Sequence, residues 1–172
     1  ANHGIRTAPM FVSRIEDNEG NTIATFQPRM NEVIGAENAM KMLTMLMGVV
    51  DGGTAGRLRY RYNLEGQIGA KTGTTNNNSD GWFIGFTPQL VSGCWVGGEE
   101  RDIHFDSMNM GQGATMALPI WAIFMKKVYA DPSLGIRPDV KFDLPDGYDP
   151  CYKPKSDQDD FEQVDGIDEV FE

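Results

Sequence analysis

The spacing of hydrophobic positions changes along the chain, from the alternation of β-strands to the three- or four-residue spacing of helices. Two β-prone segments, residues 10–15 and 22–26, flank a run of Asp, Asn and Gly. These residue types tolerate turn conformations, so the arrangement predicts a β-hairpin near the start of the chain.

Two long helices are predicted further along. Residues 36–50 repeat methionine, leucine and valine at helical spacing, and a Gly-Gly pair then stops the helix. Residues 114–129 are apolar nearly all round, which implies burial against a sheet or another chain. Pro119 is tolerable there only in the first turn or as a kink.

Three strand candidates lie between the helices, at residues 65–74, 81–87 and 90–97. Their connections are short, and short connections favour antiparallel neighbours. We therefore expect an α/β (α+β) fold, in which an antiparallel sheet of about three strands plus the hairpin packs with the two helices.

The acidic residues gather at one end of the chain. The net charge is −10, and residues 131–172 hold 13 acidic and 4 basic residues. This Pro- and Asp-rich segment predicts an acidic tail after a folded portion at residues 1–130, with 156–172 disordered. No basic stripe offers contacts to phosphates, which argues against nucleic acid as a partner.

Cysteine and histidine carry little chemistry here. Cys94 lies in an apolar run and is interpreted as a small core residue, while a bridge to Cys151 in an oxidising compartment stays open. The spacing of the two histidines with these cysteines fits no metal site. The sequence shows no signal peptide and no transmembrane stretch.

Residues 69–75, Gly-Ala-Lys-Thr-Gly-Thr-Thr, are the most informative stretch for chemistry. Lys71 offers a positive charge for an anionic substrate end, and Thr72 and Thr74 lie two residues apart, on one face of a strand. Gly73 lets a substrate backbone approach. The Thr74 N–H is then free to stabilise a developing oxyanion.

A phosphate-binding loop is the alternative interpretation of this stretch, because Gly-Ala-Lys-Thr is similar to the end of a Walker A motif. That motif needs glycine where Ala70 stands and again where Glu65 stands. The phosphate interpretation therefore fails.

The wider context resembles the transpeptidase domain of class A (bifunctional) penicillin-binding proteins over residues 1 to about 130. The similar segments read ANHG at 1–4, VVDGGTAG at 49–56, GAKTGTTN at 69–76, DGWFIGFTP at 80–88, VSGCWVG at 91–97 and MGQGA at 110–114. The resemblance implies a partial penicillin-binding/β-lactamase-like transpeptidase fold.

The resemblance also implies a function: a membrane-anchored, periplasm-facing enzyme that cross-links D-Ala-D-Ala stem peptides of peptidoglycan and binds β-lactams. Lys71 and Thr74 would be catalytic, and Thr72, Gly73, Thr74 and Thr75 would bind substrate. The family needs no cofactor or metal. A glycosyltransferase domain would lie elsewhere in the parent protein.

Two motifs of that family are missing, so we expect a fragment that is inactive alone. No serine is followed by lysine three residues later, as a Ser-x-x-Lys nucleophile requires. Ser107-Met108-Asn109 spells Ser-x-Asn, but it follows the Lys-Thr-Gly strand, whereas the family places that motif before it. We interpret it as coincidental.

Two alternatives remain at the level of sequence. Beside the transpeptidase fragment, the chain could be a non-catalytic module that binds peptidoglycan peptides, or an interaction (dimerisation) module. Partners would be the missing N-terminal part of the domain, or a second copy that covers exposed core surface.

Overall fold

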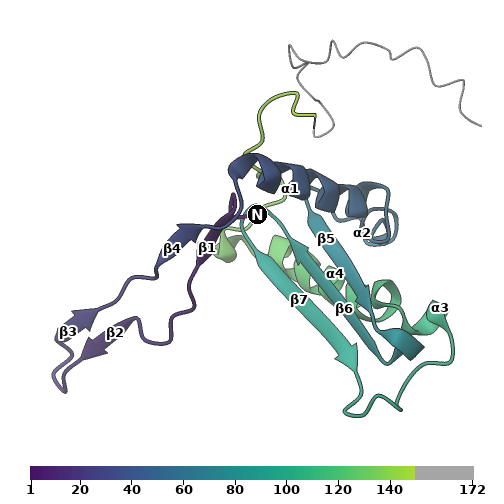
Figure 1. Cartoon of the computed structure of the whole chain (residues 1–172), viewed down its shortest axis with the longest axis horizontal. Coiled ribbons are helices and arrows are strands. Elements are labelled where there is room, and N and C mark those ends of the chain that lie inside the picture. The colour runs from purple at the N-terminus through teal and green to yellow at the C-terminus, as the bar shows by residue number, and fades with distance from the viewer. Residues whose placement is uncertain (150–172) are drawn as a thin grey trace, which may run out of the picture.

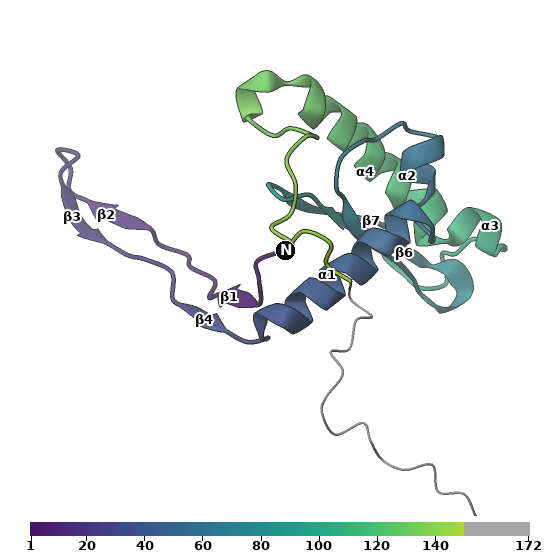
Figure 2. The ribbon, with the colours of Figure 1, turned by 90° about the horizontal axis from the view of Figure 1, so that it is seen from above.

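The computed structural model describes residues 1–149. It shows a three-stranded sheet between two long helices, and a thin two-stranded arm that extends away from this body (Figures 1 and 2). The predicted disorder of 156–172 and the possible Cys94–Cys151 bridge lie outside the described residues.

The arm is the predicted hairpin, with a second strand pair at its base. Strands β2 (Arg14–Glu16) and β3 (Thr22–Thr25) pair at the tip, and β1 (Ile5–Thr7) pairs with β4 (Met30–Glu32). Both pairings are antiparallel. The paired strands are shorter than predicted, and a proline on each side, Pro9 and Pro28, lies in the interruption between the two ladders. Proline has no N–H to donate to a ladder.

Helix α1 (Ala36–Asp51) confirms the first helix prediction. It ends at two glycines, and the second approaches the helix closely: a Cβ on Gly53 would lie 2.8 Å from the Cα of Val49. Only glycine fits such a turn. The chain then enters the short helix α2 (Arg57–Tyr60), whose Leu58 is fully buried.

The sheet is the predicted antiparallel meander, in the order β5 (Gly69–Thr74), β6 (Asp80–Phe86), β7 (Val91–Gly97). A short helix η1 (Asn76–Asn78) joins β5 to β6. The prediction that the first strand begins at residue 65 is wrong. Gly66 has a positive φ of 82° and packs against the backbone of Pro138, so the extended strand begins only at Gly69.

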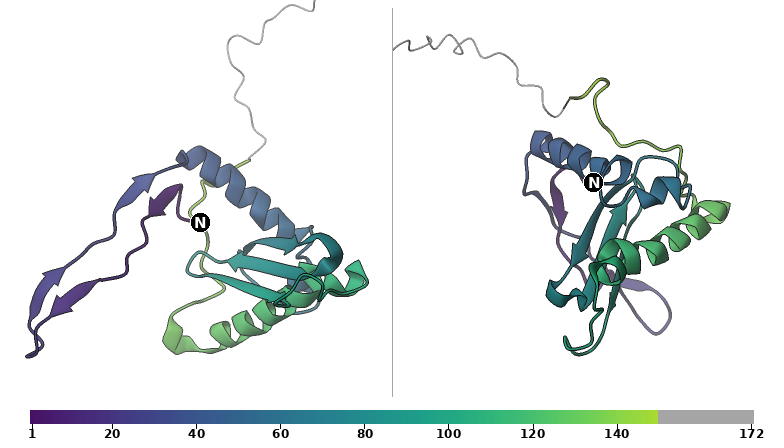
Figure 3. Two further views of the ribbon diagram at one scale, coloured as in Figure 1. Left: turned by 60° about the horizontal axis from the view of Figure 1, so that its bottom comes forward. Right: turned by 90° about the vertical axis from the view of Figure 1, so that its right-hand side faces the viewer.

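Helix α4 (Gly113–Ala130) confirms the second long helix and follows the short α3 (Met108–Gly111). It crosses the face of the sheet opposite α1 (Figure 3). Trp121 is its largest buried side chain, stacking edge-on against Phe83 with ring centroids 5.2 Å apart. Pro119 lies in the second turn rather than the first, and the helix continues past it.

The chain beyond α4 packs back onto the body rather than leaving it at once. The segment after η2 (Pro132–Leu134) is held by the side-chain amide of Gln89. The Gln89 Nε2 donates to the Gly135 carbonyl (3.0 Å), and its Oε1 accepts from the Arg137 N–H (2.9 Å). Phe142 then stacks against Phe86 in a small cluster with α1. Ordered packing therefore extends past residue 130, and the division at that residue stays a prediction.

Candidate active site

The Lys-Thr-Gly sequence lies on a strand, β5, as its residue pattern predicts, and the fold places this strand at an edge of the three-stranded sheet. The Thr75 N–H donates to the Asp80 carbonyl across the pair with β6 (3.1 Å). N–H groups alternate in direction along an antiparallel strand, so those of Thr74 and Thr72 point away from β6, along the open edge. The edge therefore presents donors to an incoming group.

Thr72 and Thr74 share one face of the strand. Thr72 is paired with Phe83, whose ring packs on α4, and cross-strand partners point to the same face. The Thr74 Oγ1 accepts from the Gly113 N–H (3.0 Å), and the Thr72 Oγ1 lies 3.0 Å from the Oγ1 of Thr54. The predicted pair of hydroxyls is therefore brought together, and each is held by a different element.

Lys71 projects from the opposite face, across from Ile84. Its side chain is exposed, and its Nζ donates to the carbonyl of Thr72 (2.7 Å). The ammonium group thus folds back onto the strand instead of lying beside the two hydroxyls.

Gly73 lies where the first turn of α4 meets the strand. A Cβ on Gly113 would overlap the carbonyl oxygens of Gly73 and Trp82, so the helix backbone sits directly against the strand. A Cβ on Gly73 itself would lie 3.2 Å from the Cβ of Trp82. Gly113 is therefore needed for the contact of α4 with the strand, whereas Gly73 leaves room for its cross-strand neighbour Trp82.

Thr75 belongs to the turn that follows the strand. Its Oγ1 lies 2.9 Å from the Ser79 Oγ, accepts from the Asp80 N–H (2.9 Å) and donates toward the Asp80 carboxylate (3.2 Å). These internal bonds occupy the hydroxyl, so the structure gives Thr75 a role in closing the turn.

Two residues that the sequence did not single out hold the surroundings of the strand: one contacts β5 and the other contacts the first turn of α4. Thr54 contacts Thr72, and the Arg57 guanidinium donates to the Ala114 carbonyl (3.2 Å) and the Thr115 hydroxyl (3.1 Å). Both lie within or beside the segment that resembles the family, but only the fold shows which groups they reach.

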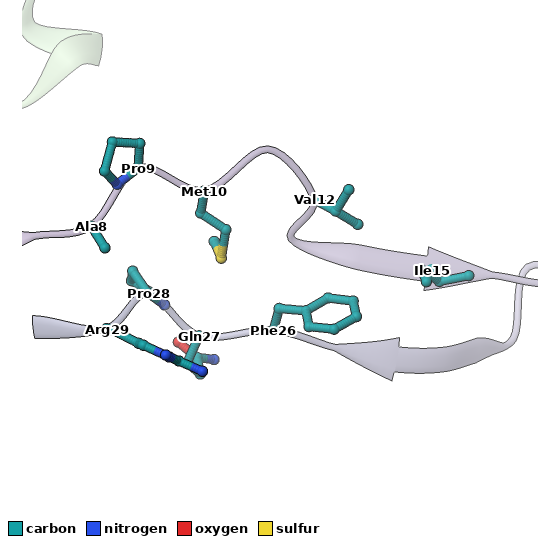
Figure 4. Close-up of a pocket in the computed structure, with 9 residues that line it drawn as sticks. All are labelled: Ala8, Pro9, Met10, Val12, Ile15, Phe26, Gln27, Pro28 and Arg29. Carbon is teal, nitrogen blue, oxygen red and sulfur yellow. The ribbon is translucent and has the colours of Figure 1, made fainter.

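Two hollows lie away from this strand. One, of about 470 Å³, lies between the prolines of the arm, where Met10, Val12 and Phe26 line it (Figure 4). The other, of about 310 Å³, lies under the loop that carries Ile103, His104 and Phe105. No residue from 71 to 75 lines either.

Other candidate chemistry is sparse in residues 1–149. No three His, Cys, Asp or Glu side chains of this part of the chain gather closely enough to hold a metal ion. None of its helices is long and apolar enough to cross a membrane. Cys94 is half-buried, and burial raises the pKa of its thiol. Ser107 and Asn109 lie at the start of α3.

A family model, the penicillin binding protein transpeptidase domain, matches residues 1–93, just over half of the chain. The chain therefore belongs to the family of penicillin-binding protein transpeptidase domains.

Curated relatives of the chain include several penicillin-binding proteins 1A. That of Aquifex aeolicus is 34% identical over 145 residues, which is 84% of this chain and 18% of the relative. That of Neisseria lactamica is 34% identical over 154 residues, 86% of this chain and 18% of the relative. The predicted class A resemblance is confirmed, and the chain spans less than a fifth of these relatives' length.

Solved structures show the same fold. Penicillin-binding protein 1A from Haemophilus influenzae matches with a TM-score of 0.68 at 24% identity, over 84% of this chain and 26% of that one. Penicillin-binding protein A from M. tuberculosis, solved as an imipenem acyl-enzyme complex, matches with a TM-score of 0.52 at 22% identity. The match covers 73% of this chain and 28% of that one. The predicted partial transpeptidase fold is confirmed.

Proposed function

We propose that this chain forms one wall of the active site of a serine-type D-Ala-D-Ala transpeptidase that cross-links peptidoglycan. The observation that carries the proposal is the open edge of β5, where two supported hydroxyls and outward N–H groups line a family motif. Membership of the transpeptidase-domain family supports it, as does the imipenem acyl-enzyme of the M. tuberculosis relative.

In this proposal Thr72 and Thr74 bind the terminal carboxylate of the stem peptide. The Thr74 hydroxyl already accepts a hydrogen bond from the Gly113 N–H, so its own hydrogen is available to an anion. The outward Thr74 N–H stabilises the oxyanion of the tetrahedral intermediate.

Lys71 is a further catalytic residue in this proposal, and Gly73 and Thr75 have supporting roles. Lys71 attracts the anionic substrate and polarises the proton relay of the nucleophilic serine, which requires its Nζ to leave the Thr72 carbonyl. Gly73 lets the substrate backbone lie along the strand. Thr75 holds the turn that ends the strand. The reaction needs neither metal nor cofactor.

The whole protein would be anchored in the bacterial inner membrane and face the periplasm, with a glycosyltransferase domain elsewhere. Residues 1–130 would be the C-terminal portion of its transpeptidase domain and 131–172 an acidic tail. Its ligands would be stem peptides and β-lactams. The preceding part of the domain would supply the nucleophilic serine, so the isolated chain would not be acylated.

Acylation by a fluorescent penicillin tests this function. In the whole protein, Lys71→Ala should slow covalent labelling at least 100-fold, since general acid–base catalysis contributes about 10²–10⁴-fold. Lys126→Ala, an exposed lysine on α4, is the matched control and should label at the normal rate. Unchanged labelling of Lys71→Ala, or denaturation-resistant labelling of the isolated chain, would contradict the assigned roles.

The exposed arm favours a second candidate, an interaction role. Large apolar side chains on it face solvent, among them Phe11 at 98% exposure and Ile23 at 66%. Such surface is typical of protein contacts. Light scattering of the isolated chain tests association with a second copy, and a monomer at high concentration would count against it.

A further inference from the structure

Thr54 and Thr72 form a hydroxyl pair at the open edge of β5. Their Oγ1 atoms lie 3.0 Å apart, and the positions of the heavy atoms allow either hydroxyl to donate. Each hydroxyl has one hydrogen. The direction of this bond therefore decides whether Thr72 has a hydrogen left for a ligand.

Thr54 is held in place by the backbone around it. The turn that carries it is closed by hydrogen bonds from the Ala55 N–H to the Val49 carbonyl (3.0 Å) and from the Gly56 N–H to the Gly53 carbonyl (3.1 Å). Ala55 and Leu58 are fully buried on either side of Arg57. The Thr54 side chain itself is exposed, so this rigid turn presents its hydroxyl at the surface.

The neighbouring threonine shows what such an arrangement achieves. At Thr74 the donor is the Gly113 N–H, which cannot reverse, so the Thr74 hydrogen always remains available. At Thr72 the corresponding partner is the Thr54 hydroxyl, which rotates. An anion at the edge favours the direction in which Thr72 donates outward, because the other direction turns oxygen lone pairs toward the negative charge.

We infer that Thr54 is a positioning residue: it donates to the Thr72 Oγ1 and thereby directs the single Thr72 hydrogen to the carboxylate of an anionic ligand. The inference rests on the proposed function, in which Thr72 binds that carboxylate. A hydroxyl that accepts a hydrogen bond is also a stronger donor, so the Thr54 bond strengthens the contact with the ligand.

This role has a signature that a structural role lacks: it depends on the charge of the ligand. Thr54→Val in the whole protein should slow acylation by an anionic penicillin about 3- to 10-fold, within the range of couplings between residues of one hydrogen-bond network. It should leave acylation by the uncharged methyl ester of the same penicillin unchanged. Thr54→Ser keeps the hydroxyl and should restore the rate.

The matched control is Thr44→Val on α1, which removes a hydroxyl bonded to the Met40 carbonyl at 3.0 Å. This variant should change neither the rate of acylation by the anionic penicillin nor the rate of acylation by its methyl ester. The double variant Thr54→Val/Thr72→Val should be no slower than Thr72→Val alone, because Thr54 acts through Thr72. Thermal unfolding of every variant, with Thr54→Ala as a second truncation, separates folding from positioning.

The outcomes are distinct. If Thr72→Val slows the anionic penicillin and Thr54→Val does not, the positioning role is overturned and the proposed function stands. If Thr54→Val slows acylation by the penicillin and by its ester equally, Thr54 is a structural residue, and the positioning role is again overturned. If Thr72→Val has no effect on the anionic ligand, the proposed role of Thr72 fails first and the inference fails with it.

Discussion

The sheet body and the hairpin arm both carry large hydrophobic side chains, but with opposite effects. In the body, Phe83 and Trp121 pack edge-on and are almost fully buried between β6 and α4. In the arm, Phe11 and Ile23 face solvent on a ribbon that no helix covers (Figure 2). An isolated two-stranded ribbon is at best marginally stable in water. A hydrophobic residue thus stabilises this fold only where a second layer meets it.

The same contrast explains where the candidate site lies. Partners for the hydroxyls of β5 come from the turn after α1 and from the first turn of α4, because both helices pack against the sheet. The arm has an open hollow of about 470 Å³, but the residues that line it come from one ribbon only. Precise placement of catalytic groups needs the rigidity of the body.

The sharpest test of this comparison is truncation of one aromatic residue in each region. Trp121→Ala removes a buried ring and the hydrogen bond from its Nε1 to the Ser92 hydroxyl (2.7 Å), so the free energy of unfolding should fall by about 3–5 kcal/mol. Phe11→Ala should change it by less than about 0.5 kcal/mol, as is usual for exposed positions. Urea unfolding measures both. A large loss for Phe11→Ala would mean that the arm is packed in solution.

A smaller effect is expected from methyl groups added to two glycines. Gly113→Ala should destabilise the protein by about 1–3 kcal/mol, because its Cβ would overlap backbone oxygens of β5 and β6. It should also displace α4 from Thr74 and slow penicillin acylation of the whole protein. Gly48→Ala, inside α1 with open space around it, should instead stabilise by about 0.5–1 kcal/mol. Thermal unfolding of both variants compares them, and equal effects would argue against the close contact of α4 with β5.

The smallest effect concerns thiol chemistry and pH. Burial raises the pKa of Cys94, so less thiolate is present near neutral pH than in a free cysteine, and alkylation should be slower. Its rate should rise with pH up to that higher pKa. In a Cys151→Ser background, Ser13→Cys on the exposed arm supplies a matched thiol that should react faster. If both thiols react alike, Cys94 is not protected by the sheet.

The sequence predicted much of this architecture because its signals are local. The hairpin turn, both long helices and the antiparallel meander all follow from spacing and from turn residues a few positions apart. The start of β5 was missed because Gly66 has a positive φ and lies against the backbone of Pro138, which is far along the chain. The packing of residues 131–144 was missed for a similar reason: Gln67, Phe86 and Gln89 hold this polar segment from a distance.

The sequence alone determined the family and the strand that carries the candidate chemistry, because Lys71, Thr72, Gly73 and Thr74 are consecutive and a strand sets their alternation. Only the tertiary structure decided which groups meet that strand. It placed Thr54 against Thr72 and Gly113 against Thr74. It also directed the Thr75 hydroxyl to Ser79, within the turn that follows β5. The physical reason is that hydrogen bonds between distant residues depend on how helices pack across a sheet, and local spacing does not encode that packing.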